Sequence, residues 1–282
     1  MISAIRPTDD PDRRKLISPL FTEDERHLLE FERLRDFVRD RTCSVAERYQ
    51  NGFFLTGRAG TGKTRLVTDT LDQLRTLWTY RNARMSAMGL YALLEEHQEH
   101  AIVLDDIGSL FDQLPALQIL LAALGGRPGR PRPVTYTIKE KNERKSFDFS
   151  GSIIAISNVT LRRDPLADAV ASRIPTLEHN PTDDQIAAFM RHQSLSGFED
   201  LDWKECLQVV EYVIESSRAN DYPLDLRWME RGWQDFRLVK HGKALRTWRE
   251  LVTSSMKVIS HQFADGSDDH GRICCASRYG SK

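Results

Sequence analysis

One eight-residue stretch constrains the fold of this 282-residue sequence more than any other part. Residues 57–64, Gly-Arg-Ala-Gly-Thr-Gly-Lys-Thr, have the pattern G-x-x-x-x-G-K-[ST]. The apolar run Phe53-Phe54-Leu55 comes directly before it. After it, apolar residues recur at helical spacing, at Leu66, Val67, Leu71 and Leu74. This order predicts a buried strand, a tight loop and a helix, as at the start of an α/β fold with a mostly parallel sheet.

The residue types in this loop suit a phosphate ligand. Glycines let backbone N–H groups turn toward phosphate oxygens, and the helix that follows adds the positive end of its dipole. We expect Lys63 to face the β- and γ-phosphates and the Thr64 hydroxyl to bind Mg²⁺. The full set expected to bind ATP from this loop is Gly57, Gly60, Thr61, Gly62, Lys63 and Thr64. The alternative is a glycine-rich turn that matches the pattern by chance.

Two adjacent acids follow the next strongly apolar run, residues 101–104. Asp105 and Asp106 are therefore expected at the carboxyl end of a buried strand, where open α/β sheets hold their ligands. Asp105 is expected to hold Mg²⁺ through a water molecule, and Asp106 to orient the attacking water or accept its proton. The alternative is a solvated strand end. The short side chain of Asp106 leaves the rate of hydrolysis open.

Composition and charge narrow the class of protein. Hydrophobic residues make up 40% of the chain, enough for a packed core and too many for a disordered or collagen-like chain. The formal net charge of −1 means that any nucleic-acid site must be a local patch. The four cysteines include no C-x-x-C pair, which argues against a disulfide scaffold and a standard zinc site. With no signal-peptide pattern and no apolar run of about 20 residues, we expect a cytoplasmic protein without a membrane contact.

Further elements follow the loop and the acidic pair in a recognisable order. Residues 152–158 form an apolar run that ends in Asn158, and residues 166–173 end in Arg173. Together with the loop and the acids, these segments resemble the motifs of the AAA+ ATPase superfamily over about residues 25–255. The paired aspartates resemble its replication-initiator and helicase-loader branches. The resemblance implies a P-loop NTPase sheet sandwiched by helices, a small all-α lid, and Mg²⁺-dependent ATP hydrolysis.

The resemblance also implies roles for two of these residues. Asn158 resembles sensor 1, which lies beside the γ-phosphate and suits placement of the lytic water. Arg173 resembles the arginine finger that reaches the nucleotide of a neighbouring subunit, which implies a ring or helical homo-oligomer. Arg162 and Arg163 are rival fingers, and a surface salt bridge is the structural alternative for Arg173.

The composition changes along the chain predict its domains. We expect a flexible arm at 1–21, a nucleotide-binding domain at 22–180, a helical lid at 181–260 and a disordered tail at 261–282. Helices are expected near 22–50 and 87–97, and in the lid near 182–195, 202–218 and 225–260. In the lid, Arg227 resembles a sensor 2 arginine that folds over the nucleotide, with Arg231 as its rival and a solvated helix arginine as the alternative.

A basic hairpin is expected as an insertion at 125–151, because a Gly- and Pro-rich turn precedes a β-prone run, a polar turn and a second run. Residues 127–145 contain seven basic and two acidic residues, a net charge of +5. The position resembles the pre-sensor 1 hairpin of some AAA+ branches. The residues expected to contact nucleic acid are Arg130, Arg132, Lys139, Lys141, Arg144 and Lys145. Alternatively, these charges only keep an exposed hairpin soluble.

These features lead us to expect an AAA+ ATPase that oligomerises and couples Mg·ATP hydrolysis to remodelling, loading on or translocating nucleic acid. DNA is the preferred substrate, in replication, recombination, transposition or defence, and a targeting or effector protein is the expected partner. One alternative is a protein remodeller whose pore loop would be Met88-Gly89-Leu90-Tyr91, although a plain helix start suits these residues better. A slow ATP-dependent assembly switch is the other.

Overall fold

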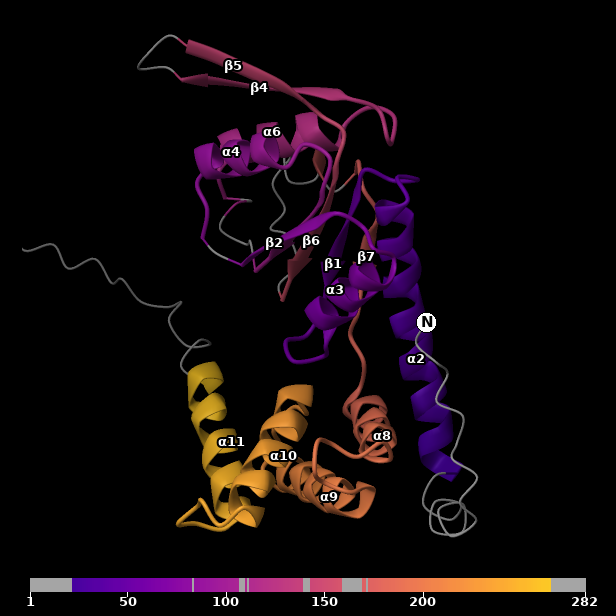
Figure 1. Cartoon of the computed structure of the whole chain (residues 1–282), viewed down its shortest axis with the longest axis vertical. Helices are drawn as coiled ribbons and strands as arrows, with labels where there is room; N and C mark the ends of the chain where they lie inside the picture. The colour runs from indigo at the N-terminus through magenta and orange to yellow at the C-terminus, as the bar shows by residue number, and fades with distance from the viewer. Residues whose placement is uncertain are drawn as a thin grey trace, which may run out of the picture. The chain divides into compact units, whose positions relative to one another are not determined.

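The computed structural model describes residues 22–82, 84–106, 110, 112–138, 143–158, 169–170 and 172–264 (Figure 1). The chain divides into two compact units between Phe189 and Met190. Several expectations lie outside the described residues: the arm at 1–21, the tail beyond residue 264, Arg162, Arg163, Lys139 and Lys141.

The first unit is built on one sheet of five parallel strands, in the order β2-β3-β6-β1-β7. The strands are β1 (Gly52–Thr56), β2 (Trp78–Asn82), β3 (Ala101–Asp105), β6 (Ser152–Ser157) and β7 (Thr176–Glu178). The last residue of β1, Thr56, pairs with Ser157 of β6 and with Glu178 of β7. Because every strand runs the same way, all carboxyl ends lie at one edge, which we call the carboxyl edge.

Helices cover both faces of this sheet (Figure 1). On one face, α2 (Thr22–Ala46) and α3 (Lys63–Gln73) contribute Val38, Val45, Leu66, Val67 and Leu71 to a core with the strands. On the other face, α4 (Ala87–Glu96) and α6 (Leu114–Leu124) pack their apolar sides. Every residue of β1 and β6 is buried, as expected for strands covered on both faces. The expected α/β class, a parallel sheet flanked by helices, is confirmed.

An antiparallel hairpin extends from this unit and lies over α4 and α6 (Figure 1). Its strands are β4 (Arg132–Ile138) and β5 (Glu143–Phe149), within the segment where the sequence predicts a hairpin. Tyr91 of α4 places its ring 5.6 Å from that of Tyr136 and 5.0 Å from that of Phe147. Aromatic packing of this kind holds the hairpin to the helices.

Arg132, at the start of the hairpin, corrects a prediction. It is expected to contact nucleic acid, yet only 4% of its surface is exposed. Its guanidinium donates hydrogen bonds to Asn51 Oδ1 and the Gly151 carbonyl, and it lies 5.3 Å from the centre of the Phe149 ring. Burial, with the nearby charge of Arg48, lowers the pKa of Arg132 to about 10. Arg132 therefore fastens the base of the hairpin to the sheet and does not face solvent.

The second unit contains the end of α8 (Asp183–Ser194), then α9 (Trp203–Ala219), α10 (Leu226–Lys240) and α11 (Trp248–Ala264). The single helix expected over 225–260 is wrong. Gly242 adopts a left-handed conformation with φ 67°, and the Lys243 N–H donates to the Leu238 carbonyl at 3.1 Å. This is the turn that commonly ends a helix, because glycine carries no Cβ penalty there.

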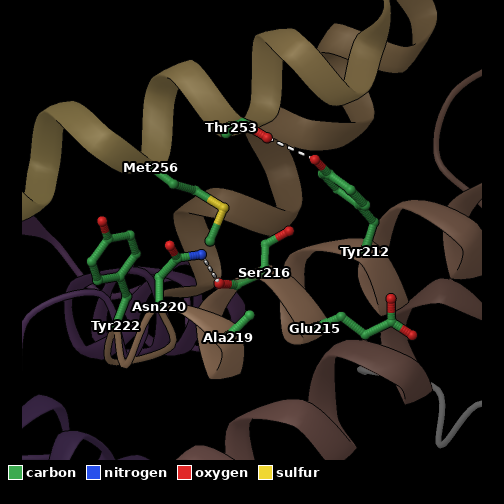
Figure 2. Close-up of a pocket in the computed structure, with 8 residues that line it drawn as sticks. All are labelled: Tyr212, Glu215, Ser216, Ala219, Asn220, Tyr222, Thr253 and Met256. Atoms are coloured by element: carbon green, nitrogen blue, oxygen red, sulfur yellow. Dashed lines mark hydrogen bonds between the residues drawn. The ribbon is translucent and has the colours of Figure 1, made fainter.

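A hollow of about 360 Å³ lies between α9 and α11 in the second unit (Figure 2). On one side, the Tyr212 hydroxyl and Thr253 Oγ1 are 2.7 Å apart. On another, Asn220 Nδ2 donates to the Ser216 carbonyl at 2.7 Å, and Met256 projects nearby. Of the described residues expected to bind ATP or nucleic acid, none lines this hollow.

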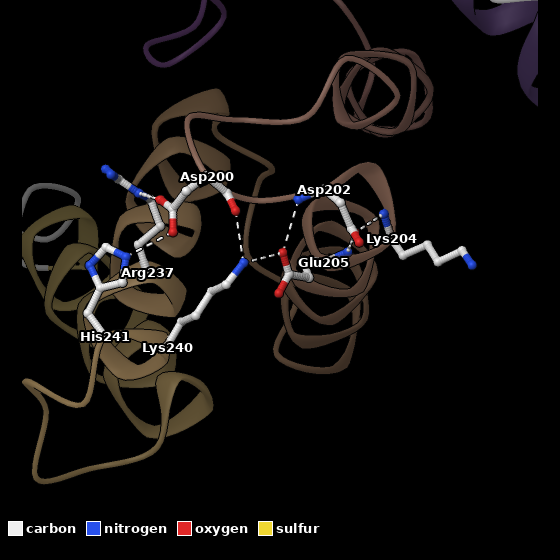
Figure 3. Close-up of polar contacts among 7 residues, drawn as sticks. All are labelled: Asp200, Asp202, Lys204, Glu205, Arg237, Lys240 and His241. Atoms are coloured by element: carbon white, nitrogen blue, oxygen red, sulfur yellow. Dashed lines mark hydrogen bonds and ion pairs between the residues drawn. The ribbon is translucent and has the colours of Figure 1, made fainter.

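Ion pairs connect the end of α10 to the start of α9 (Figure 3). Asp200 accepts hydrogen bonds from Arg237 and His241, and these bonds lower the pKa of Asp200 to about 2. Lys240 donates to Glu205 at 2.8 Å. The basic residues at the end of α10 are therefore neutralised within their own unit.

Replacing Arg132 by Met should lower the free energy of unfolding by about 2–4 kcal/mol, because Asn51 Oδ1 and the Gly151 carbonyl lose their donor while buried. Urea unfolding followed by circular dichroism measures this change. The matched control is Arg130→Met, which alters an exposed side chain and should change stability by less than about 0.5 kcal/mol. Equal effects of the two variants would contradict the structural role of Arg132.

Candidate functional site

The glycine-rich loop joins β1 to α3 at the carboxyl edge. Gly60 and Gly62 adopt left-handed conformations, with φ 75° and 83°, which few other residues tolerate. A Cβ on Gly57 would lie 1.9 Å from the His179 carbonyl oxygen, so only glycine fits there. The N-cap residue of α3 is Gly62, which has no side chain to cap the helix, and α3 begins at Lys63. The amino end of α3, with the positive end of its dipole, is therefore next to the loop, an arrangement that suits an anion.

Lys63 is the most buried charged group of the loop, with 5% of its surface exposed. Its ammonium donates to the carbonyls of Gly57 at 2.8 Å and Arg58 at 2.7 Å, and to Asn158 Oδ1 at 3.1 Å. Asn158 directly follows β6, the strand beside β1. The sheet order thus brings together two residues that are 95 positions apart in the sequence.

A second group of polar side chains meets at Asp105, the last residue of β3. Asp105 Oδ2 accepts hydrogen bonds from Thr64 Oγ1 at 2.8 Å and from the Tyr80 hydroxyl at 2.9 Å. The structure therefore brings the expected magnesium ligands Thr64 and Asp105 together. Burial raises the pKa of Tyr80, and the charge of Asp105 adds to the rise. The phenol therefore stays protonated and donates a hydrogen bond to Asp105.

Tyr80 is a site residue that the sequence analysis missed. It lies in the half-buried edge strand β2, whose alternation of Thr79, Tyr80 and Arg81 gives no buried-strand signal. Only the pairing of β2 with β3, which sets Asn82 beside Asp105, shows that Tyr80 belongs to the carboxyl edge.

Asp106 is exposed and follows β3 in a left-handed conformation with φ 55°. Its N–H donates to the Ile156 carbonyl at 3.0 Å, which fixes its backbone to β6. Its charge contributes to the raised pKa of Tyr80. Asp106 therefore lies at the same edge as Asp105, with its carboxylate open to solvent.

His179 is a second residue that the sequence analysis missed. It follows β7, is 1% exposed, and places Nε2 3.2 Å from the Thr61 carbonyl. Burial lowers the pKa of His179 to about 4, with the charges of Lys63 and Arg35 acting in the same direction. A neutral imidazole that carries its proton on Nε2 can donate a hydrogen bond to the Thr61 carbonyl and so stabilise the conformation of the glycine-rich loop.

Arg173 does not join these residues. It precedes β7, and the first residue of β7 pairs with Phe54, so Arg173 lies near the amino ends of the strands. It is exposed and lines a hollow with Asn51 and Gly52, where β1 begins. The five residues of β1 span about 16 Å along the strand. Within one chain, Arg173 thus lies near the amino ends of the strands, and the glycine-rich loop lies at their carboxyl ends.

Arg227 belongs to the second unit, at the start of α10. Its side chain is exposed and lies 3.9 Å from Asp225, the residue that caps this helix. Its rival Arg231 is also exposed.

The basic residues of the hairpin are only partly described. Arg130 and Lys145 are exposed, as a nucleic-acid contact requires. Arg144 pairs with Thr137 in the ladder, and its side chain lies outside the described part of the chain.

The atoms of Thr64 and Asp105 that could bind a metal at the carboxyl edge are oxygens, which are the ligands that Mg²⁺ prefers. In the described part of the chain, no group of three or more His, Cys, Asp or Glu side chains is placed to hold a metal. Mg²⁺ would therefore need other ligands besides Asp105 and Thr64. Phosphate oxygens and water meet this need in sites that bind Mg²⁺ through one or two protein ligands.

Comparison with known proteins assigns no activity to the chain. No family model matches it. Over 120 residues it is 28% identical to an uncharacterized 36.7 kDa protein in the nrdC-mobD intergenic region of Enterobacteria phage T4. The match covers 39% of this chain and 36% of that protein, so the chain spans about a third of its relative. Among the described helices, none is long and apolar enough to cross a membrane.

The buried His179 predicts a pH dependence of stability. Between pH 6.5 and about 4 the unfolded imidazole binds a proton and the folded one does not, so stability falls as the pH falls through this window, by up to about 3 kcal/mol. His179→Gln should remove this component while keeping a donor for Thr61. Urea unfolding of both proteins at several pH values measures it. A difference between them that stays constant with pH would contradict the prediction.

Proposed function

We propose that this chain is a Mg²⁺-dependent ATPase of the AAA+ type that works as an oligomer on nucleic acid, with DNA preferred. The observation that carries the proposal is the convergence of Lys63, Thr64, Asp105 and Asn158 at the carboxyl edge of a parallel sheet. A glycine-rich turn that matched the motif by chance would not require side chains from α3, β3 and the end of β6 to meet there.

In this proposal the amino end of α3 and the ammonium of Lys63 bind the β- and γ-phosphates. Phosphate oxygens compete for Lys63 with the carbonyls of Gly57 and Arg58, which it contacts here. A charged oxygen is the stronger acceptor, so it takes the ammonium. Asn158, which also contacts Lys63, is then near enough to hold the attacking water.

Mg²⁺, when bound, would neutralise phosphate charge in the transition state. Thr64 and Asp105 are the residues that would hold it, since their oxygens are 2.8 Å apart. Asp106 is exposed and adjacent, so its carboxylate can accept a proton from the water. Because Asp is shorter than Glu by one methylene, the reach of this base is limited, which favours slow hydrolysis.

The place of Arg173 supports an oligomer. An arginine finger contributes about 10³–10⁵ in rate where it has been measured in GTPases. Arg173 lies at the edge of the sheet opposite the loop, so it can serve a nucleotide only in a neighbouring chain. A ring or helical assembly supplies such a neighbour.

The hairpin supports nucleic acid as the substrate. Arg127, Arg130 and Lys145 are exposed around it, and phosphate contacts of this kind provide most sequence-independent affinity. A protein substrate is less well supported. The pore loop considered for it falls in α4, where Leu90 and Tyr91 are buried.

Lys63→Ala should lower ATP hydrolysis by about 100-fold or more, as expected for losing a group that stabilises the transition-state charge. Arg75→Ala, which changes an exposed residue after α3, is the matched control and should leave the rate unchanged. Phosphate release should rise with single-stranded or duplex DNA, and this stimulation should weaken at higher salt. Hydrolysis that is indifferent to DNA would shift the proposal to a protein substrate, and equal rates for Lys63→Ala and wild type would refute it.

Arg173→Ala should also lose hydrolysis, and mixing it with Lys63→Ala should restore part of the rate. In a mixed oligomer, an intact Lys63 site can receive Arg173 from the neighbouring Lys63→Ala chain. Steady-state hydrolysis at several mixing ratios measures the rescue. Full activity of Arg173→Ala alone, or mixtures that stay inactive, would argue against a site shared between subunits.

A further inference from the structure

We infer that Tyr80 is a positioning residue that fixes the carboxylate of Asp105 for Mg²⁺; this inference rests on the proposed function. Tyr80 is neither in the glycine-rich loop nor next to the acidic pair. It reaches Asp105 from β2, the edge strand of the sheet, and its hydroxyl donates to Oδ2 at 2.9 Å.

Strand pairing and a hydrogen bond from Asn82 orient the Tyr80 hydroxyl toward Asp105. In the parallel register of β2 and β3, Tyr80 lies beside Val103 and Asn82 beside Asp105. Asn82 Nδ2 donates to the Tyr80 oxygen at 3.2 Å. Because the phenol oxygen accepts from Asn82, its own proton is directed to the carboxylate. The three side chains form a short relay from Asn82 through Tyr80 to Asp105.

The relay matters because one carboxylate oxygen serves two donors. Asp105 Oδ2 accepts from both Thr64 and Tyr80, which come from different elements, α3 and β2. Thr64 would hold a metal through a lone pair of its oxygen and keep its proton for Asp105, so the Tyr80 phenol is a second donor that fixes the same carboxylate oxygen from β2. Hydrogen-bonding partners of metal ligands typically change metal affinity or activity by about 10–100-fold when removed.

The test uses the full chain and a fluorescent ATP analogue, whose affinity is measured in EDTA and across a Mg²⁺ titration. Tyr80→Phe keeps the ring and removes the hydroxyl. We expect the Mg²⁺ concentration that gives half of the gain in nucleotide affinity to be about 10-fold higher than in the wild type. The affinity in EDTA should be unchanged. The matched control is Tyr91→Phe, because the buried Tyr91 hydroxyl has no hydrogen-bond partner among the described residues, and it should behave like the wild type.

A second variant, Asn82→Ala, removes the donor to the phenol oxygen and should shift the Mg²⁺ requirement in the same direction by a smaller factor. Unchanged Mg²⁺ requirement in Tyr80→Phe, with normal Mg²⁺-dependent binding by the wild type, would overturn the role of Tyr80 and leave the proposed function standing. Loss of affinity in EDTA together with a lower melting temperature would assign Tyr80 a purely structural role and also overturn the inference. Wild-type protein that binds no nucleotide would overturn both.

Discussion

The buried ammonium of Lys63 is the interaction on which the arrangement of the site depends. A buried charge is costly unless it is hydrogen-bonded, and this one contacts two loop carbonyls and Asn158. Those contacts require β6 to lie beside β1 and the loop to fold back over its own strand. The left-handed glycines permit that fold, and His179 supports it from behind. The loop conformation, the order of the strands and the start of α3 are thus all needed to hydrogen-bond the Lys63 ammonium.

The parallel sheet converts this arrangement into a site with two chemically different halves. Around Lys63, donors and a helix end suit phosphate oxygens. Around Asp105, the carboxylate oxygens and the Thr64 hydroxyl oxygen suit a hard cation. The halves lie side by side because Lys63 and Thr64 are consecutive residues, while Asp105 ends β3 and Asn158 directly follows the neighbouring strand β6. A phosphate-bound metal needs this juxtaposition.

Sequence reasoning located the elements whose patterns are strong. The strands β1, β3 and β6 are continuous apolar runs, and the loop has a specific motif, so both could be predicted. The strands β2 and β7 are half-exposed or only three residues long and carry no such pattern. Tyr80 and His179 were therefore missed, because their contacts depend on strand pairing. Arg132 was misassigned because charge alone does not reveal burial. The break after α10 was missed although the sequence carries a signal for it, since Gly242 lies within the polar run 240–243 and glycine commonly ends a helix.

The central claim, that the site around Lys63 binds ATP, is tested most directly by measuring nucleotide binding. Isothermal titration of the wild-type chain with a non-hydrolysable ATP analogue in Mg²⁺ should give saturable binding at one site per chain. Lys63→Ala, which removes the ammonium that joins the loop to Asn158, should bind far more weakly under the same conditions. Wild-type protein without measurable binding, or a Lys63→Ala variant with the same affinity, would contradict the account.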